Sequence, residues 1–175
     1  MIIRQEEPKD HNAVFKLVAN AFKDEQYTDH KEQFLVDRLR KSAAFIPELS
    51  LVAEIDSEII GYILLTKIHI KGNHSQETAA LALAPVAVMK KHRGKGIGEK
   101  LIRRAHEIAK ELKFTSVILL GHANYYPKFG YQPTKKYGIK LPFDVPEENA
   151  MLIELKTNAL KNTSGTVTYP KELCE

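Results

Sequence analysis

The sequence predicts an α+β fold with a mixed sheet. Apolar residues recur at helical spacing near the start of the chain, and short apolar runs separated by polar turns follow between residues 51 and 89. One strongly amphipathic stretch then covers residues 96–112, and shorter apolar runs come after it. Helices placed before and after a run of strands, instead of alternating with each strand, are typical of this fold class.

The first forty residues predict one strand and two helices. Ile2–Gln5 has the composition of a short strand, and Pro8 and Asp10 are residue types that favour a helix start. Residues 14–22 place their apolar side chains at helical spacing, and Glu32–Ser42 repeats that pattern. Both helices therefore precede the main run of strands.

A β-hairpin and a long strand are predicted next. Leu51–Ile55 and Ile59–Thr66 are apolar runs joined by a polar turn at residues 56–58. Thr78–Met89 has the composition of a longer strand, but it contains Pro85. Because proline has no N–H group to donate to a neighbouring strand, we expect a bulge or an end of pairing at this residue.

The clearest helix of the chain is predicted at Gly96–Leu112, and three shorter elements follow it. Ser116–Leu120 is a short apolar strand, and Asn124–Phe129 has the composition of a brief helical turn that ends before a glycine. Ala150–Leu155 is another apolar strand. The alternating pattern of Thr166–Tyr169, in the last twenty residues, is compatible with an added edge strand.

Length and composition exclude several classes of protein. The chain has 175 residues, 43% of them hydrophobic, which fits one globular domain with a short tail. Cys174 is the single cysteine, so an intramolecular disulfide and a cysteine-based zinc site are excluded. The longest apolar run, Ala79–Met89, is too short to cross a bilayer, and Met1–Asp10 lacks the apolar core of a signal peptide. We therefore expect a cytoplasmic protein that does not insert into a membrane.

Metal and nucleic-acid binding are not expected either. The histidines do not show the spacing of a metal-binding motif, so we predict no metal site. The net charge of +4 is small because acidic residues are almost as numerous as basic ones. This excess permits an anionic ligand without demanding a nucleic acid.

A glycine-rich turn opens the clearest helix. Residues 86–98 read V-A-V-M-K-K-H-R-G-K-G-I-G, so that an apolar strand, a basic turn and a helix follow one another directly. Glycines at positions 94, 96 and 98 allow a tight bend that exposes backbone N–H groups, and the helix N-terminus adds unpaired donors with a positive partial charge. We predict a phosphate or pyrophosphate site here. The alternative is a solvated basic loop in which the glycines only form a turn.

Two other phosphate-binding motifs fit this turn less well. A P-loop requires Ser or Thr after its Gly-Lys pair, whereas Gly96 is followed by Ile97. A dinucleotide-binding fingerprint requires a different spacing of the third glycine and an acidic residue at the end of the next strand, which Leu119 and Leu120 do not provide.

Several segments together resemble the GCN5-related N-acetyltransferase (GNAT) superfamily. The pattern Arg93-x-x-Gly96-x-Gly98 after an apolar strand resembles the acetyl-CoA-binding motif of that superfamily. Residues 124–131, N-Y-Y-P-K-F-G-Y, resemble its aromatic-rich second motif, and the predicted hairpin resembles its second and third strands. The Gly121-His122 pair and the T-V-T-Y-P tail look most like a bacterial subgroup of predicted acetyltransferases with unassigned substrates.

The resemblance implies a GNAT fold over residues 1–155 and a C-terminal extension over residues 156–175. That fold is a twisted, mixed and mostly antiparallel sheet with flanking helices and a splay between two central parallel strands, here Ala82–Met89 and Ser116–Leu120. Pantetheine would enter the splay and the turn would hold the pyrophosphate, which makes acetyl-CoA the implied co-substrate. The residues implied in cofactor binding are Val86, Ala87, Val88, Arg93, Gly94, Lys95, Gly96, Ile97, Gly98 and Tyr125.

The resemblance also implies two catalytic candidates. In the superfamily a tyrosine four residues before the last glycine of the second motif often protonates the leaving thiolate, and this position is Tyr126. Packing on the core is the alternative role for this tyrosine. The strand Ala79–Met89 lacks the acidic residue that many relatives use to accept the proton of the amine. His122 is the candidate base, since histidine exchanges protons near neutral pH, and a purely structural or solvated histidine is the alternative.

The implied reaction is direct transfer of an acetyl group from acetyl-CoA to a primary amine. The acceptor is expected to be a small molecule or a protein amine, recognised by residues 21–41 and 130–148. A non-catalytic acyl-CoA sensor is the alternative function, and DNA binding through residues 90–95 is a third interpretation that the small net charge disfavours. Both a monomer and a homodimer are compatible with the sequence.

Overall fold

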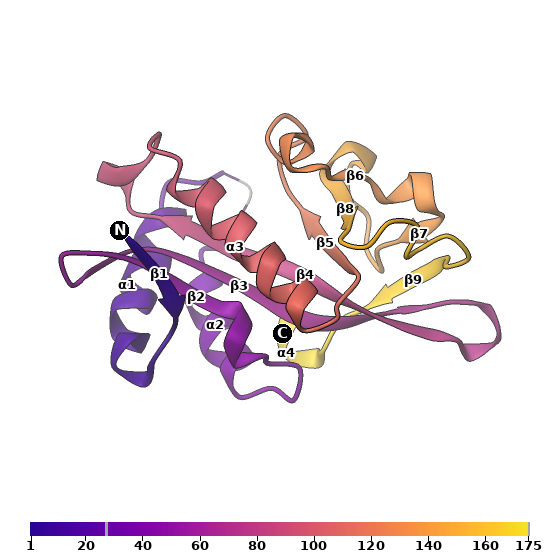
Figure 1. Cartoon of the computed structure of the whole chain (residues 1–175), viewed down its shortest axis with the longest axis horizontal. Helices are drawn as coiled ribbons and strands as arrows, with labels where there is room; N and C mark the ends of the chain where they lie inside the picture. Colours follow the sequence, from indigo (N-terminus) through magenta and orange to yellow (C-terminus); the bar gives the residue numbers. More distant parts are fainter. Residues whose placement is uncertain (27, 175) are drawn as a thin grey trace.

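The computed structural model describes residues 1–26 and 28–174 (Figure 1). Tyr27, which belongs to the predicted acceptor segment 21–41, and Glu175 lie outside this description. The strands are β1 (Ile2–Gln5), β2 (Ser50–Ile55), β3 (Glu58–Lys71), β4 (Glu77–Val88), β5 (Ser116–Leu120), β6 (Gln132–Pro133), β7 (Ile139–Lys140), β8 (Ala150–Glu154) and β9 (Gly165–Thr168). The α-helices are α1 (His11–Phe22), α2 (Glu32–Arg40), α3 (Ile97–Glu111) and α4 (Lys171–Cys174). None of the helices so described is long and apolar enough to span a bilayer.

The strands form one mixed sheet in the order β1-β2-β3-β4-β5-β8-β6, with β9 added beside β3 and β7. Neighbours along the main path are antiparallel except for β4 and β5, which are parallel. The predicted α+β class with a mixed, mostly antiparallel sheet is therefore confirmed. The hairpin is longer than predicted, because β3 and β4 continue together to Lys71 and Glu77.

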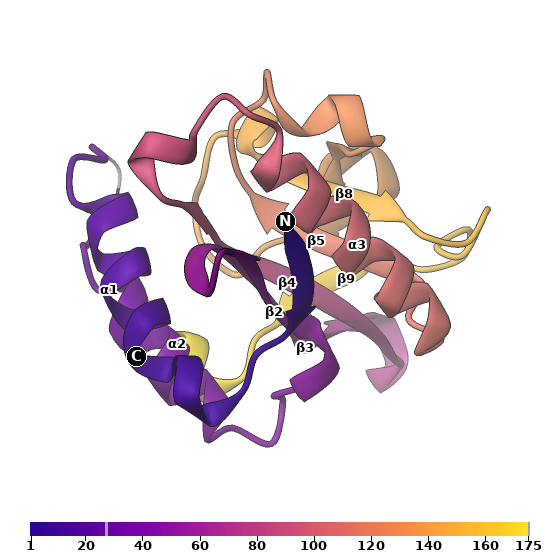
Figure 2. The same ribbon diagram turned by 60° about the vertical axis from the view of Figure 1, so that its left-hand side comes forward.

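Helices cover both faces of this sheet (Figure 2). On one face α3 packs on the strands through Leu101, Ile102 and Ala105, which are fully buried, and we call this the α3-side core. On the other face α1 and α2 pack through buried residues such as Val18 and Leu39. The apolar stripe predicted for each helix is thus the side that it buries.

The C-terminal extension covers the remainder of the second face. Strand β9 pairs antiparallel with β3 from His69 to Lys71, and Val167 at its centre is buried. It packs with Ile68, Ile118 and other buried apolar residues. We call this cluster the tail-side core; its members are Ile68, Ile70, Ala80, Ala82, Ile118, Ile139, Leu152, Leu160 and Val167. Helix α4 then reaches α2, where Ser42 Oγ donates to the carboxylate of Glu172 at 3.1 Å. The extension is therefore an integral part of the packed structure.

A bulge in β4 lies at Pro85, where the sequence predicted either a bulge or an end of pairing. The register against β3 shifts between Ile63 opposite Val86 and Leu65 opposite Leu83. As a result Leu83 and Val86 both face the α3-side core, although they lie three positions apart. An uninterrupted strand would have placed them on opposite faces.

The two parallel strands separate immediately after they pair. Strand β4 pairs with β5 only at Leu81 opposite Val117 and at Ala82 opposite Ile118. Beyond this point β4 continues beside β3 while β5 continues beside β8. The backbone edges of the two strands therefore diverge towards their carboxyl ends, which is the splay implied by the family resemblance. We call the space between these diverging edges the slot.

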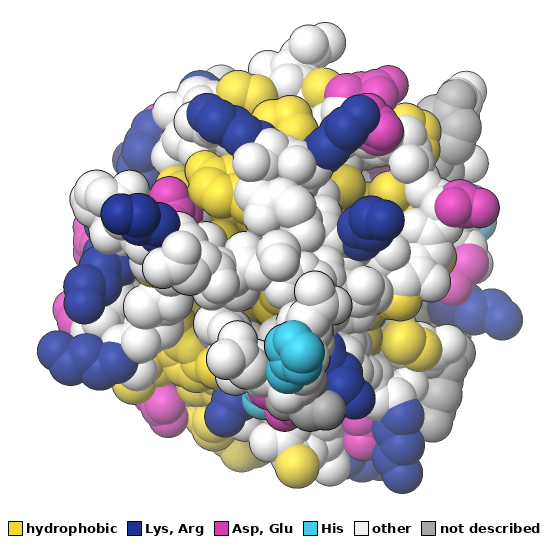
Figure 3. Space-filling view, turned by 90° about the vertical axis from the view of Figure 1, so that its right-hand side faces the viewer, with side chains coloured by type: hydrophobic (Ala, Val, Ile, Leu, Met, Phe, Trp, Pro, Cys, Tyr) yellow, Lys and Arg dark blue, Asp and Glu magenta, His cyan; other side chains and the backbone are white. Residues whose placement is uncertain are grey.

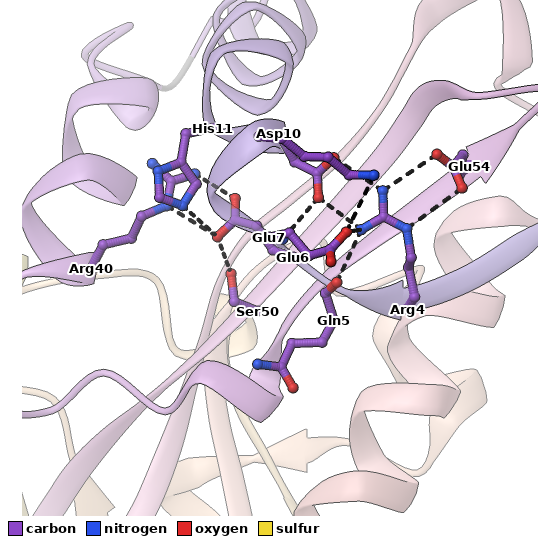
Figure 4. Close-up of polar contacts among 10 residues, drawn as sticks. Arg4, Gln5, Glu6, Glu7, Asp10, His11, Arg40, Ser50 and Glu54 are labelled. Carbon is purple, nitrogen blue, oxygen red and sulfur yellow. Dashed lines mark hydrogen bonds and ion pairs between the residues drawn. The ribbon is translucent and has the colours of Figure 1, made fainter.

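A network of ion pairs joins the start of the chain to α2 and to the sheet (Figure 4). Arg40 Nε donates to Glu6 Oε1 at 3.0 Å, and Ser50 Oγ donates to the same oxygen at 2.8 Å. Arg4 holds Asp10 through two hydrogen bonds of 2.7 and 3.0 Å. These hydrogen bonds lower the pKa of the Asp10 carboxyl. The side chain of Glu6 is 3% exposed, so its charge depends on these partners.

Candidate functional site

The glycine-rich turn lies at the carboxyl end of β4, beyond the point where β4 and β5 stop pairing. A single 3₁₀ turn at Lys90–His92 follows the strand, and Gly96 is the residue that precedes the first turn of α3. Gly94 has a φ of 79° and Gly96 a φ of 78°, a region that residues with a side chain rarely adopt. The sequence V-A-V-M-K-K-H-R-G-K-G-I-G therefore forms a strand, a left-handed bend and a helix start, as predicted.

The bend presents a row of free hydrogen-bond donors. Within the described residues, the backbone N–H groups from Gly94 to Glu99 have no acceptor, whereas the N–H of Lys100 donates to the carbonyl of Gly96 at 3.1 Å. A helix start leaves such donors unpaired, and the helix dipole adds a positive partial charge. This arrangement suits an anion with several oxygens.

The space in front of the bend is open. A Cβ atom built on Gly94 or Gly96 would find no heavy atom within 4 Å. A Cβ atom on Gly98 would lie 3.5 Å from Oη of Tyr125 and 3.7 Å from Cγ2 of Val88, which are ordinary contacts. The space beside these glycines is therefore free of crowding protein atoms, and a ligand that approached the backbone could occupy it.

The basic side chains around the bend are not all free to bind an anion. Lys90 is paired with Asp24, and Lys91 lies 3.2 Å from a carboxylate oxygen of Glu58. Lys95 is exposed and has no ion-pair partner in the described part of the chain. Of the lysines here, Lys95 is therefore the one whose charge remains uncompensated.

Arg93 holds the bend against two other elements. Its Nε atom donates to the carbonyl of Val88 at 3.3 Å, and its Nη2 atom donates to the carbonyl of Ala21 at 2.9 Å. The guanidinium therefore connects the end of β4 and the end of α1 to the turn. These contacts make Arg93 a positioning residue for the bend.

The three predicted pantetheine contacts divide between the two faces of β4. Val86 and Val88 are half-buried and pack against the α3-side core. Ala87 is 3% exposed, and its side chain packs on the opposite face with α1 and α2. Ala87 can therefore offer only its backbone to a ligand in the slot.

Tyr126 lies on the β5 side of the slot. It begins the 3₁₀ turn Tyr126–Phe129, which ends at Gly130 with a φ of 105°, so the brief helical turn predicted from the sequence is confirmed. Its ring packs against Phe129 and Tyr131, and the residue is 8% exposed. Burial raises the pKa of Tyr126 to about 12. Its hydroxyl has no hydrogen-bond partner among the described residues and is not fully enclosed.

Tyr125 lies beside the glycine turn. Its ring meets that of Tyr126 edge to face at 5.0 Å, and its hydroxyl is the nearest atom to the Cβ position of Gly98. The ammonium group of Lys128 lies 4.4 Å from the centre of the Tyr125 ring. The two motifs singled out in the sequence, the glycine turn and the aromatic segment, are therefore in contact.

His122 is exposed at the end of β5, and its imidazole makes no hydrogen bond with any described residue. Its carbonyl accepts the N–H of Tyr125 at 3.1 Å, so the backbone of His122 starts the turn that carries both tyrosines. The side chain is open to solvent on the loop that leads to Tyr126.

A separate open cleft of about 1130 Å³ lies between α1 and the β2–β3 turn. It reaches Met89 and the neighbouring lysines, but its lining does not include β5 or the aromatic segment. It is therefore distinct from the slot. No group of three His, Cys, Asp or Glu side chains within residues 1–26 and 28–174 is arranged to hold a metal ion.

Comparison with known proteins identifies the family. Residues 2–134 match the family described as the acetyltransferase (GNAT) domain. The chain belongs to the GNAT acetyltransferase family. The resemblance seen in the two sequence motifs is thereby confirmed, and the protein is an acetyltransferase of this family.

Two relatives from Escherichia coli strain K12 illustrate the match. The uncharacterized N-acetyltransferase YjhQ is 36% identical over 120 residues, which cover 68% of this chain and 66% of YjhQ, just under two thirds of its length. The uncharacterized N-acetyltransferase YhbS is 27% identical over 170 residues, covering 97% of this chain and 96% of YhbS. The similarity to YhbS therefore includes the C-terminal extension.

Solved GNAT structures have the same architecture. The crystal structure of YhbS from Escherichia coli in complex with CoA matches with a TM-score of 0.89 and 25% identity, covering 99% of this chain and 92% of that one. A GNAT acetyltransferase from Brucella melitensis in complex with acetyl-CoA matches with a TM-score of 0.80 and 28% identity, covering 98% and 96%. The fold is thus shared with GNAT proteins along nearly the whole chain.

Sequence reasoning missed two features of this GNAT site. Gly121 lies directly under the ring of Tyr126, and Asn149 fixes Gly121 through two hydrogen bonds of 2.9 Å. His106 on α3 is buried and bonds the hydroxyl of Tyr131 at 2.8 Å, behind the Tyr126 ring. The Gly-His pair before the tyrosines was a signal for the first feature, whereas a histidine on a helix gave no signal for the second.

Proposed function

We propose that this GNAT protein transfers an acetyl group from acetyl-CoA directly to a primary amine. The observation that carries the proposal is the row of unpaired N–H groups from Gly94 to Glu99 at the mouth of a slot between two diverging strands. A pyrophosphate at the bend and a pantetheine arm along the slot match these two features in chemistry and in order. The CoA and acetyl-CoA complexes of the two related structures support the choice of co-substrate.

The residues present fit that co-substrate. Gly94, Gly96 and Gly98 leave room for phosphate oxygens near the backbone, and Lys95 supplies a free positive charge. Val86 and Val88 offer apolar contacts along one wall of the slot, while Ala87 offers its backbone. Ile97 is buried and anchors the first turn of α3, and Tyr125 closes the side of the bend. Arg93 positions the whole turn.

In the reaction a nitrogen–carbon bond forms, the carbon–sulfur bond of the thioester breaks, the amine loses a proton and the sulfur gains one. Tyr126 is the proposed proton donor for the sulfur. With a pKa of about 12 its phenol is protonated at neutral pH, as a general acid must be, and its hydroxyl is not engaged elsewhere. Its location on the β5 side of the slot supports this role.

His122 is the proposed acceptor for the proton that leaves the amine. Its exposed imidazole can pass that proton to solvent, and it lies on the loop that positions Tyr126. Residues 79–89, which include the part of β4 next to the slot, contain no acidic side chain, so this strand offers no carboxylate as an alternative base there.

Two measurements on the purified full chain test the proposal. Acetyl-CoA alone should raise the melting temperature, because a ligand that binds only the folded state stabilises it. Thiol release from acetyl-CoA should then depend on an added primary amine. An unchanged melting temperature would refute the cofactor site, and stabilisation without thiol release on a broad amine panel would refute the transfer reaction.

A further inference from the structure

We infer that His106 acts through Tyr131 as a positioning residue for Tyr126, so that helix α3 fixes the place of the proposed acid as well as that of the co-substrate phosphates. The inference rests on the proposed role of Tyr126 as proton donor. It assigns a function to a buried histidine that the transfer reaction does not otherwise use, and it leaves His122 as the proposed base.

His106 occupies a place on α3 that suits an apolar residue. The buried stripe of this helix runs through Ile102, Ala105 and Ala109, and His106 lies on the same face with 7% of its surface exposed. Figure 3 views the end of the molecule that holds the β3–β4 hairpin, where a histidine side chain stands out into solvent instead. Removing an imidazole from water costs free energy unless it gains a hydrogen-bond partner. A partner inside the core must therefore compensate for the burial of His106.

That partner is the hydroxyl of Tyr131. Nε2 of His106 lies 2.8 Å from Oη of Tyr131, and the two rings are tilted by 43° with their centres 5.5 Å apart. Burial lowers the pKa of His106 to about 4 and raises the pKa of Tyr131 well above its ordinary value, so both groups are uncharged near neutral pH. Tyr131 is 2% exposed, and a satisfied polar pair in such a core specifies one arrangement of its members.

The ring of Tyr131 in turn supports the ring of Tyr126. The two rings meet edge to face at 73°, with their centres 5.7 Å apart. The other ring neighbours of Tyr126 are Tyr125 and Phe129, which lie in or directly before the same 3₁₀ turn and so cannot fix that turn as a whole. Tyr131 lies outside the turn and is held by α3. It is therefore the ring contact that can set the place of Tyr126 relative to the helix.

Helix α3 joins this contact to the glycine turn. Its first turn presents the N–H groups proposed to hold the pyrophosphate, and His106 lies roughly 14 Å further along the helix than Ile97. The phosphate site and the support of the acid are therefore parts of one helix. This common support matters because a shift of about 1 Å in a reacting group can lower a rate by about 100-fold.

Two variants break the hydrogen bond and one keeps it. Tyr131→Phe retains the ring without the hydroxyl, His106→Leu is apolar, and His106→Gln keeps a hydrogen-bonding group near the place of Nε2. We expect kcat for thiol release, measured with putrescine, glucosamine and phenethylamine at saturating acetyl-CoA, to fall by about 10-fold in the first two variants and by less in His106→Gln. The thermal shift caused by acetyl-CoA should stay unchanged in all three.

The same substitution in the Tyr126→Phe background separates positioning from a general structural role. If the pair acts only through the hydroxyl of Tyr126, His106→Leu should lower kcat by less than about 2-fold once that hydroxyl is absent. A residue that supports the fold in general would cause the same loss in either background. An undiminished loss in the Tyr126→Phe background therefore overturns the inference, as does wild-type kcat in both Tyr131→Phe and His106→Leu.

Nuclear magnetic resonance of the protein labelled with ¹³C in its tyrosine rings gives a test that needs no acceptor. The Tyr126 signal is identified by its absence in Tyr126→Phe, and it should move in His106→Leu. Tyr62→Phe is the matched control, because it removes an equally buried hydroxyl from a 2.7 Å bond with Ser50 on the α1 side of the sheet. The control should leave both kcat and the Tyr126 signal unchanged. An unmoved Tyr126 signal in His106→Leu, or an equal loss of kcat in Tyr62→Phe, would overturn the inference.

Failure of the proposed function would look different. Wild-type kcat in Tyr126→Phe would remove Tyr126 as the acid, and absence of an acetyl-CoA thermal shift in the wild type would remove the cofactor site. A large loss of kcat in Tyr126→Phe together with normal kcat in Tyr131→Phe and His106→Leu would leave the transfer reaction intact and overturn only the role of His106.

Discussion

The ring of Tyr126 lies directly against the backbone of Gly121. A Cβ atom at Gly121 would be 2.3 Å from Cε2 and 2.7 Å from Cδ2 of that ring, distances at which one of the two groups must move. Gly121→Ala should therefore displace Tyr126 and lower kcat by about 10-fold or more, since small misplacements of a reacting group are costly. Steady-state thiol release measures kcat, and the acetyl-CoA thermal shift shows whether the cofactor site survives.

The contrary outcome for Gly121→Ala is simple to recognise. If kcat stays at the wild-type value while the protein is folded, the position of the Tyr126 ring is not important for turnover. Ala123→Gly, two residues further along the same loop, is a suitable control because it removes a side chain without adding a contact to the ring.

Tyr126→Phe should lower kcat by about 100-fold, the lower end of what a general acid contributes. The phenyl ring keeps the packing against Phe129 and Tyr131, so only the hydroxyl is lost. Acetyl-CoA affinity, measured by calorimetry, should change little. Tyr125→Phe is the matched control and should have a much smaller effect on kcat; equal losses of kcat and affinity in Tyr126→Phe would contradict the acid role.

Gly98→Ala should weaken acetyl-CoA binding by about 10-fold or more, because a methyl group at a helix start that holds phosphates crowds their oxygens. The fold accommodates this methyl group, since its nearest neighbours would be 3.5 and 3.7 Å away. Calorimetric titration gives the affinity, and the melting temperature of the free protein shows that it remains folded. Gly96 is less suitable, because its φ of 78° makes any substitution strained. Normal affinity in Gly98→Ala would place the phosphates elsewhere.

His106 should make the protein less stable as the pH falls from about 6.5 to about 4. Burial lowers the pKa of His106 in the folded state to about 4. The unfolded chain, with a histidine pKa of about 6.5, therefore binds more protons in this window, and acidification favours unfolding by up to about 3 kcal/mol. Below about pH 4 the folded form is protonated too, so this contribution stops growing.

Urea unfolding at pH 7, 5 and 4 tests the role of His106. The wild type should lose more unfolding free energy between pH 7 and pH 4 than His106→Gln does. His122→Gln, which alters an exposed histidine, should lose as much as the wild type. Parallel curves for the wild type and His106→Gln would show that the buried imidazole does not titrate as expected.

Arg40→Leu should destabilise the fold by about 3–5 kcal/mol, because it leaves the buried Glu6 carboxylate without its counter-charge. Among the described residues, Glu6 would retain only the hydrogen bond from Ser50 and the distant imidazole of His11 at 3.9 Å. The double variant Glu6→Leu/Arg40→Leu should recover part of the loss, since no buried charge remains. Glu107→Gln, which removes an exposed ion pair with Arg104, should change the unfolding free energy by less than about 1 kcal/mol.

Local patterns in the sequence predicted the elements that form the proposed acetyl-CoA site, namely β4, the glycine turn and α3. The helix predicted from the amphipathic stretch 96–112 agrees with α3 to within two residues at each end. The bulge at Pro85 was one of the two outcomes predicted from the missing N–H group of proline. The glycine turn was found because strand, glycines and helix occur in order along the chain. Each of these predictions depends on residues that are close in sequence.

Features made by distant segments could not be predicted in this way. The opposite faces taken by Val86 and Ala87 on β4 depend on the bulge at Pro85, which reverses the side that each later residue occupies, and local sequence does not indicate this. The pairing of Lys90 with Asp24 joins residues 66 positions apart, and nothing local indicates it. The two-residue strands β6 and β7 carry too little pattern to be recognised, and they exist because β8 and β9 lie beside them.

The pairing of Lys90 and Lys91 with Asp24 and Glu58 has a consequence for ionic strength. If an anion binds at this bend as proposed, it would be held chiefly by hydrogen bonds from backbone amides, and only Lys95 and Arg93 among the described lysines and arginines of residues 90–95 lack a carboxylate partner. Added salt would therefore weaken the binding only a little. Acetyl-CoA affinity should therefore fall only gently from low to physiological potassium chloride. A protein that bound a polyanion through charged side chains alone would lose affinity steeply as the salt concentration rises, because counter-ions are released on binding.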